Sequence, residues 1–152
     1  DGNLIIQASV FDKLVAQLQK EGGYLATPEQ KELLRKAMWD DERHRTVETV
    51  AIAPQQLAKI AGFEIPADRK FIMVHGDGIG REHHFSGEKL TTLLALYKYQ
   101  SFDQALEMMR GIYEVGGKGH SCGIYSFNQD HIHRLATALA ASADLLDDGS
   151  DA

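Results

Sequence analysis

The sequence predicts an α/β fold, namely a three-layer αβα domain with a mostly parallel sheet. Short apolar runs of strand length alternate along the chain with longer segments whose apolar residues recur at helical spacing. Strands separated by helices favour parallel pairing, with helices packed on the sheet. The 152 residues suffice for one domain with a substantial core, expected over residues 1–143, followed by an acidic tail over residues 144–152.

The first half of the chain is expected to begin with a buried strand at residues 4–6, "LII". Ser9 is the expected cap of the helix that follows, and Gly22 and Gly23 are expected to end that helix. Its apolar face consists of Val10, Phe11, Leu14, Val15 and Leu18. A second helix has Thr27 as cap, Pro28 in its first position and Glu29 in its first turn. A third helix starts near Pro54 and ends at Gly62.

The second half is expected to contain three more strands: "KFIMVHG", "LTTLLALYKY" and "SCGIYSF", at residues 70–76, 90–99 and 121–127. Between the last two lies a helix capped by Ser101 and closed by Gly116. A final helix begins near Asn128 and Asp130 and runs through "HIHRLATALAASADLL".

The composition argues against several classes of function. The net charge is −6, whereas binding to nucleic acid needs a clustered basic surface. No apolar run approaches the roughly 20 residues needed to cross a bilayer, and no signal peptide is visible. The one cysteine cannot form an internal disulfide, which favours a reducing compartment. We therefore expect a cytoplasmic protein that binds neither nucleic acid nor membrane.

Cys122 follows the glycine-rich stretch "GGKGH" and allows two interpretations. A cysteine nucleophile needs a lowered pKa and access to substrate, and His120 is two residues away, so that a thiolate–imidazole pair is conceivable on a strand. The apolar residues that follow favour the other interpretation, a small apolar residue on a buried strand. We expect the second.

Two further patterns carry weaker signals. "GDGIG" follows a strand, as a dinucleotide-binding loop does, yet the chain continues with Arg81, Glu82 and two histidines where a helix should open. The histidine pairs at positions 83 and 84 and at 131 and 133 lack the spacing of a structural zinc site. A flexible loop and solvated histidines are the expectation, with a histidine-based metalloprotein as a remote alternative.

Glu88 and Lys89 stand directly before the predicted strand at residues 90–99. Ligands of α/β sheets gather where strands meet loops, and a carboxylate there can accept hydrogen bonds from ribose hydroxyls. From residue types alone, a surface ion pair explains the two residues better than ribose binding does.

The stretch "HFSGEKLTTLLALYKYQSFDQALEMMRGIYEVGGKGHSCGIYSFNQDHI" resembles the later part of the catalytic domain of CoA-acylating aldehyde dehydrogenases. The shared marks are "EKL" before a strand, the "FDQALEM" helix and a "GG-x-GH" turn. "ASVFDKLVAQLQKEGGYL", "AIAPQQLAKIAGFEIP" and "KFIMV" resemble the preceding family segments in the same order. The resemblance covers roughly residues 1–136.

The resemblance implies a reaction in which a cysteine thiolate attacks an aldehyde, hydride passes to NAD(P), and the resulting thioester is transferred to CoA. Glu88 matches the family glutamate that contacts the ribose on the nicotinamide side, so it is the expected cofactor-binding residue. His120 matches the histidine of the "GH" turn and is a candidate for the substrate pocket. No metal site is implied.

The resemblance also has departures. The family nucleophile aligns a few positions before Asp1, so no catalytic residue is assigned within the chain, and the nucleotide-binding half of the family lies upstream. Beyond "HRLA" the family pattern fades. We therefore expect a partial relative of a CoA-acylating aldehyde dehydrogenase that is inactive alone. The alternative is an interaction module that self-associates or pairs with a full-length dehydrogenase through an open sheet edge.

Overall fold

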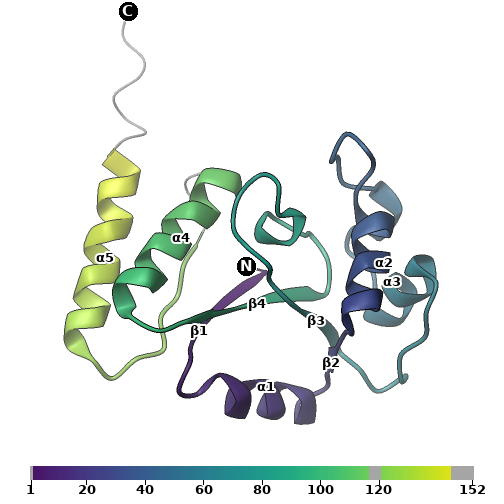
Figure 1. Ribbon diagram of the computed structural model, residues 1–152, viewed down its shortest axis with the longest axis horizontal. Coiled ribbons are helices and arrows are strands. Elements are labelled where there is room, and N and C mark those ends of the chain that lie inside the picture. Colours follow the sequence, from purple (N-terminus) through teal and green to yellow (C-terminus); the bar gives the residue numbers. More distant parts are fainter. Residues whose placement is uncertain (1, 117–120, 145–152) are drawn as a thin grey trace, which may run out of the picture.

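The computed structural model describes residues 2–116 and 121–144, with side chains described as far as residue 139. It contains a four-stranded, all-parallel sheet in the order β1-β4-β3-β2 (Figure 1). The strands are β1 (Asn3–Gln7), β2 (Gly23–Leu25), β3 (Phe71–His75) and β4 (Leu93–Tyr99). The helices are α1 (Phe11–Lys20), α2 (Pro28–Met38), α3 (Pro54–Ala61), α4 (Phe102–Gly116) and α5 (Gln129–Asp144), with short 3-10 turns η1 (Val47–Thr49) and η2 (His84–Ser86). None of the described helices is long and apolar enough to span a membrane.

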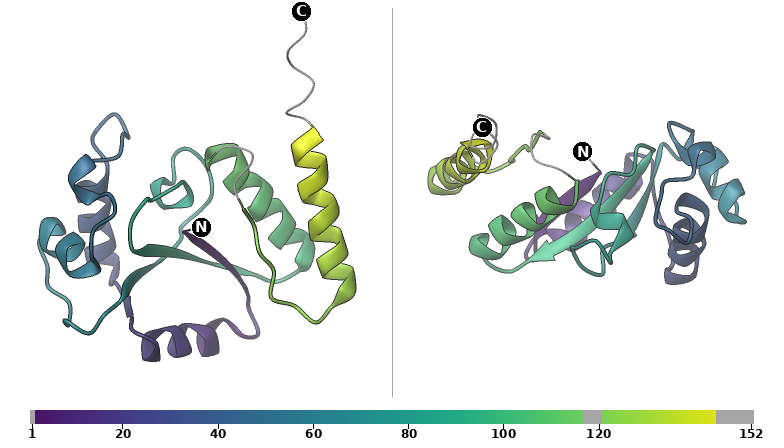
Figure 2. Two further views of the ribbon diagram at one scale, coloured as in Figure 1. Left: turned by 180° about the vertical axis from the view of Figure 1, so that it is seen from behind. Right: turned by 90° about the horizontal axis from the view of Figure 1, so that it is seen from above.

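Helices cover both faces of the sheet, which confirms the predicted α/β class. On one face α1 packs through Phe11 and Val15 against Met73 and Leu96. On the other face α2, α3 and α4 pack against the strand residues that point the opposite way, among them Ile72 and Val74, Ala95 and Tyr97. Figures 1 and 2 show α1 on its own side of the sheet and α5 lying outside α4. Each central strand is therefore buried on both faces, as parallel sheets require.

Local sequence explains where three of the helices begin. The Thr27 side chain accepts a hydrogen bond from the Gln30 amide at 3.2 Å, and the Gln30 side chain accepts one from the Thr27 amide, so that the pair forms a capping box. Asn128 caps α5 by accepting from the amide of Asp130 at 3.0 Å. Ser101 accepts from the Gln104 amide at 3.3 Å at the start of α4. These three helix starts were predicted correctly.

The prediction for the start of α1 was wrong in detail. The residue at the cap position is Val10, which makes no side-chain cap hydrogen bond, and Ser9 is one position too early. Of the predicted apolar face, Phe11 and Val15 are buried, whereas Val10 and Leu14 are 46% and 38% exposed. The buried stripe of α1 is thus narrower than the run of apolar residues suggested.

Two strand predictions also differ from the structure. The three-residue strand β2 pairs with β3 immediately after the glycines that end α1, where the sequence analysis placed no strand. Residues 121–127, predicted as a buried strand, form no strand in the described structure, and Tyr125 and Phe127 are fully exposed. β-branched and aromatic residues favour a strand only where a neighbouring strand offers hydrogen bonds, and no such pairing forms here. The predicted tail at residues 144–152 lies, after Asp144, outside the described residues.

Residues 76–92 connect β3 to β4 as an irregular loop that crosses the face covered by α2. The loop leaves β3 at Gly76, where a Cβ atom would lie 2.1 Å from the Tyr97 ring, so that only glycine fits. Further along, the Ser86 hydroxyl accepts from the Gly80 amide at 3.2 Å and lies 2.7 Å from the His83 carbonyl oxygen. Before β4, Leu90 adopts a left-handed φ of 49°. This loop carries most of the residues considered below.

Candidate functional site

A large cavity of about 590 Å³ runs along strand β1. Its walls come from β1, from α1, from α4 and from the 121–126 segment, and residues 86–88 close one end. The lining is mainly apolar, with Ile5, Val10, Leu14, Leu106 and Met109 among its members. A mostly apolar cavity with a few polar groups at one end is the usual form of a small-molecule site.

Glu88 is one of the polar groups at this cavity. It is exposed, lies in the turn that follows η2, and lines the cavity together with Ser86 and Gly87. Asn3, at the start of β1, lines the same end. The Asn3 side chain donates to the Ser86 carbonyl oxygen at 2.9 Å, which joins the turn to β1. A carboxylate in this place is open to hydrogen-bond donors of a ligand in the cavity.

Lys89, the next residue, is almost completely buried, with 1% of its surface exposed. Its Nζ donates to Asn3 Oδ1 at 2.9 Å, to the Phe85 carbonyl oxygen at 2.8 Å and to the Gly87 carbonyl oxygen at 2.9 Å. Burial, followed by the nearby charge of Arg45, lowers the pKa of Lys89 to about 7, and the charge of Glu88 opposes these effects. The surface ion pair with Glu88 that the sequence allowed is therefore not what Lys89 forms.

Arg45 reaches the same turn from the segment after α2. Its Nη2 donates to the Lys89 carbonyl oxygen at 2.7 Å, and its Nη1 donates to Thr49 Oγ1 at 2.9 Å and to the Met38 carbonyl oxygen. The guanidinium also lies 5.0 Å from the centre of the Trp39 ring. Burial lowers the pKa of Arg45. Arg45 thus ties together the end of α2, η1 and the start of β4.

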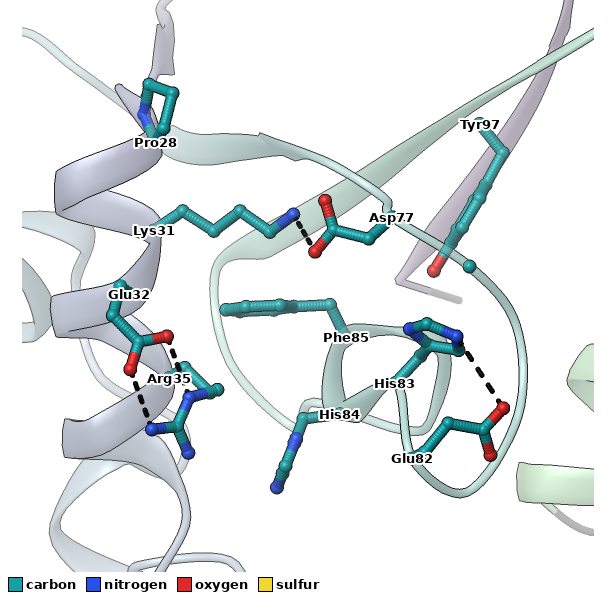
Figure 3. A pocket seen from close by; sticks show the side chains of 11 residues that line it. Pro28, Lys31, Glu32, Arg35, Asp77, Glu82, His83, His84, Phe85 and Tyr97 are labelled. Carbon is teal, nitrogen blue, oxygen red and sulfur yellow. Dashed lines mark hydrogen bonds and ion pairs between the residues drawn. The ribbon is translucent and has the colours of Figure 1, made fainter.

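A smaller, polar pocket of about 230 Å³ lies between α2 and the 76–87 part of the loop (Figure 3). On the helix side Arg35 makes a bidentate ion pair with Glu32, with N–O distances of 2.7 and 2.8 Å. Across the pocket, Lys31 Nζ lies 2.5 Å from Asp77 Oδ2. These cations already have carboxylate partners, so the pocket offers no unpaired positive charge from Lys31 or Arg35 to an anionic ligand.

Tyr97 supplies the floor of the polar pocket. Only 4% of the residue is exposed, and its hydroxyl has no hydrogen-bond partner within the described part of the chain. In Figure 3 this hydroxyl points toward His83, whereas the Asp77 carboxylate faces Lys31. Burial raises the pKa of Tyr97, and the charge of Asp77 raises it further. The phenol therefore stays protonated at neutral pH.

Comparison with known proteins gives a consistent result over most of the chain. The sequence is 28% identical over 146 residues to sulfoacetaldehyde dehydrogenase of Acholeplasma sp, covering 93% of this chain and 30% of that protein. It is 30% identical over 141 residues to the acylating sulfoacetaldehyde dehydrogenase of Cupriavidus necator, covering 91% of this chain and 28% of that protein. No protein-family model matches.

A solved structure agrees with the sequence relatives. An acetylating aldehyde dehydrogenase from Geobacillus thermoglucosidasius superimposes with a TM-score of 0.84 at 32% identity, covering 88% of this chain and 29% of that one. The chain is a homologue of the CoA-acylating aldehyde dehydrogenases. It spans about 30% of the length of these relatives. The predicted family resemblance is confirmed over this part.

Two further solved structures share the fold and hold bound ligands. An engineered glycolyl-CoA reductase holds NADP+ and matches with a TM-score of 0.79 at 20% identity, covering 91% of this chain and 31% of that one. The Rhodopseudomonas palustris propionaldehyde dehydrogenase holds propionyl-CoA and matches with a TM-score of 0.78 at 21% identity, covering 91% and 30%. At these identities the likeness establishes the fold.

The site residues considered in the sequence analysis have different positions in the structure. Glu88 lies at the large cavity, and Cys122 lines the same cavity from the 121–126 segment. His120 lies outside the described residues. Cys122 is exposed on an irregular segment, so its predicted place on a buried strand was wrong. Its neighbours nevertheless desolvate the thiol and raise its pKa, and a hydrogen bond with Tyr113 opposes that change by less. A thiol with a raised pKa is a poor candidate for a nucleophile.

The histidines and the "GDGIG" loop take part in packing within the described chain. His84 stacks edge-on against Trp39 at 5.4 Å, and His131 stacks on Phe102 at 3.9 Å between ring centres. Burial, followed by the charges of Arg35 and Arg43, lowers the pKa of His84. Among the described residues no group of three potential ligands is arranged to hold a metal ion. The glycine loop leads into the three-residue η2 and not into an α-helix, as its sequence indicated.

The unpartnered hydroxyl of Tyr97 can be tested with a matched pair of variants. A buried polar group without a partner costs about 1–3 kcal/mol, so Tyr97→Phe is expected to raise the free energy of unfolding by about 1 kcal/mol. Tyr24→Phe is the control, because the Tyr24 hydroxyl bonds the Gln30 side chain at 2.9 Å and its loss should lower that free energy by a similar amount. Urea denaturation measures both. A destabilised Tyr97→Phe variant would show that the hydroxyl is paired in solution.

Proposed function

We propose that the chain forms part of an NAD(P)-dependent, CoA-acylating aldehyde dehydrogenase, which converts an aldehyde, CoA and NAD(P)+ into an acyl-CoA, NAD(P)H and a proton. The observation that carries this proposal is the exposed carboxylate of Glu88 in the lining of a cavity of about 590 Å³, on a fold shared with acylating aldehyde dehydrogenases. The whole reaction belongs to the longer polypeptides that the chain resembles, of which it spans about 30%.

Within this function Glu88 contacts the cofactor. Its exposed carboxylate accepts hydrogen bonds from the ribose hydroxyls next to the nicotinamide, and so fixes the orientation of the ring without changing charge. When bound, the nicotinamide supplies the hydride acceptor. The apolar side chains of Ile5, Leu106 and Met109 line the same cavity and exclude water from it.

The residues described here do not supply the nucleophile of this reaction. Thiolate attack needs a cysteine with a lowered pKa, whereas the pKa of Cys122 is raised. We therefore infer that the 152-residue chain alone does not turn over an aldehyde. Its contribution is the cavity wall and the carboxylate of Glu88.

An enzyme assay tests this proposal. The purified chain, supplied with acetaldehyde or sulfoacetaldehyde, NAD+ or NADP+ and CoA, is expected to form no NAD(P)H above background when absorbance at the nicotinamide band is followed. A full-length acylating dehydrogenase assayed in parallel serves as positive control. A robust rate that Cys122→Ser abolishes would contradict the inference that the nucleophile lies outside the chain.

A second candidate function is self-association, or pairing with a full-length dehydrogenase, through the edge of the sheet. It is favoured by the position of β1, the last strand on its side of the described sheet. Apolar side chains border this edge: Val10, Leu14, Tyr125 and Phe127 are all exposed, and three of them line the cavity along β1. An unpaired strand edge beside exposed apolar groups is a template for another chain.

Light scattering across a concentration series tests the second candidate. If the edge mediates association, the mass should rise above 16.8 kDa with concentration, and the double variant Tyr125→Ser, Phe127→Ser should shift the rise to higher concentration. Val47→Ser is the matched control, because Val47 is 80% exposed on η1 and lies away from the cavity. A strictly monomeric chain at high concentration would rule out self-association through this edge, and a mixture with a full-length dehydrogenase that shows no added mass would rule out pairing.

A further inference from the structure

The amine of Lys89 is buried, and the groups around it on balance do not stabilise its charged form. Its three hydrogen-bond acceptors are a side-chain amide oxygen and two backbone carbonyl oxygens. Among the described residues no carboxylate lies within salt-bridge distance of Nζ. The charged groups that act on it are Arg45, which bonds to the Lys89 carbonyl oxygen, and Glu88, whose carboxylate is on the exposed side of the turn.

These contacts join two segments that are distant in sequence. Asn3 belongs to β1, whereas Phe85 and Gly87 belong to the turn that presents Glu88. Asn3 completes the connection by donating to the Ser86 carbonyl oxygen. The side chain of Lys89 passes so close to Gly2 that a Cβ there would lie 2.5 Å from its Cε. The lysine thus fills the space between β1 and the turn.

We propose that Lys89 is a positioning residue, which holds the Glu88 turn against strand β1 and thereby keeps the Glu88 carboxylate at the large cavity. The role of Glu88 itself rests on the proposed function, whereas the hold that Lys89 exerts on the turn does not. Removing the amine removes all three hydrogen bonds that fasten residues 85–87 to β1 through this side chain. The turn then opens without unfolding of the central strands.

The attachment of the turn to strand β1 through Lys89 is expected to strengthen as the pH rises. The pKa of Lys89 is about 7 in the folded chain and about 10.5 when water surrounds the amine, because burial and Arg45 disfavour the charged form. The released turn therefore binds a proton more tightly than the fastened turn. Protonation favours release, and the hold strengthens as the pH rises from about 7 toward 10.5.

Amide hydrogen exchange of the complete chain tests the proposal. In Lys89→Met, exchange of the amides of residues 85–90 is expected to be roughly 10–100-fold faster than in the wild type at pH 9, because the hydrogen bonds of the Lys89 amine, which is neutral at this pH and keeps two N–H donors, are lost. At pH 6 the difference should be smaller, because the wild-type turn is then weakened by the proton. Comparing both proteins at each pH cancels the intrinsic pH dependence of exchange.

Two controls make the result specific. Lys98→Met removes a half-exposed lysine of β4, with 46% of its side chain accessible, and should leave residues 85–90 unchanged. Amides of β3 should exchange alike in all variants. Equal exchange of residues 85–90 in the wild type and Lys89→Met at both values of pH would overturn the proposal, and so would a difference that shrinks as the pH rises.

A second variant covers the case in which Lys89→Met does not fold. Asn3→Asp places a carboxylate oxygen near the position of Asn3 Oδ1, 2.9 Å from Nζ. An opposite charge at this distance should raise the pKa of Lys89 and move the pH-dependent change in exchange upward by roughly 1–3 pH units. An unchanged midpoint would overturn the proposal. Neither exchange result depends on catalysis, so failure of the proposed function would be seen separately in the enzyme assay.

Discussion

Two basic side chains, the half-buried Arg45 and the buried Lys89, hold the irregular part of this domain by donating hydrogen bonds to uncharged oxygens. Arg45 bonds to carbonyl oxygens of Met38, Thr49 and Lys89, and the Lys89 amine bonds to two further carbonyls and to Asn3. Backbone carbonyls of a loop that crosses the sheet would otherwise be left without partners, which is costly away from water. Satisfying these carbonyl oxygens requires that the two basic side chains be partly removed from water, which costs free energy.

This arrangement determines where the polar end of the large cavity lies. β1 and β4 are neighbours in the sheet, so a turn that precedes β4 can reach the start of β1. Asn3 and Lys89 make that contact, and Glu88 is carried to the cavity as the residue between Gly87 and Lys89. The apolar walls come from helices that pack by ordinary burial of Leu106 and Met109. The site thus combines a regular scaffold with one turn fixed by hydrogen bonds from basic side chains.

Much of the regular structure could be predicted from the sequence because its signals are local. Thr27 followed by Pro28 starts α2, Asn128 starts α5, and apolar runs mark β1, β3 and β4. β2 was missed because three residues are too few to show a periodicity. Residues 121–127 were mispredicted because strand propensity is realised only beside a partner strand. The local sequence indicates which secondary structure a segment can form, and pairing with a neighbouring strand determines whether a strand forms.

In the candidate site, too, the residue with a sequence signal was predicted, and the residues that depend on long-range contacts were missed. Glu88 was found through a family motif, and the structure places it at the cavity. Lys89 and Arg45 carry no local mark of burial: "DDERHRTVE" around Arg45 is dense in charge and is typical of a solvated surface. Their contact joins residues 44 positions apart, and the contact of Lys89 with Asn3 joins residues 86 positions apart. The unpartnered hydroxyl of Tyr97 likewise depends on the path of a loop from elsewhere in the chain.

The central claim is that the Lys89 amine is buried without a carboxylate partner, which disfavours its charged form. The most direct measurement is a pH titration of the Lys89 side chain by NMR, following the Cε and Nζ chemical shifts, with the Lys89→Met spectrum to assign the signal. The account predicts a titration midpoint near 7, far below that of an ordinary lysine. A midpoint above 10 would mean that the amine is solvated or paired with a carboxylate, and would contradict the account.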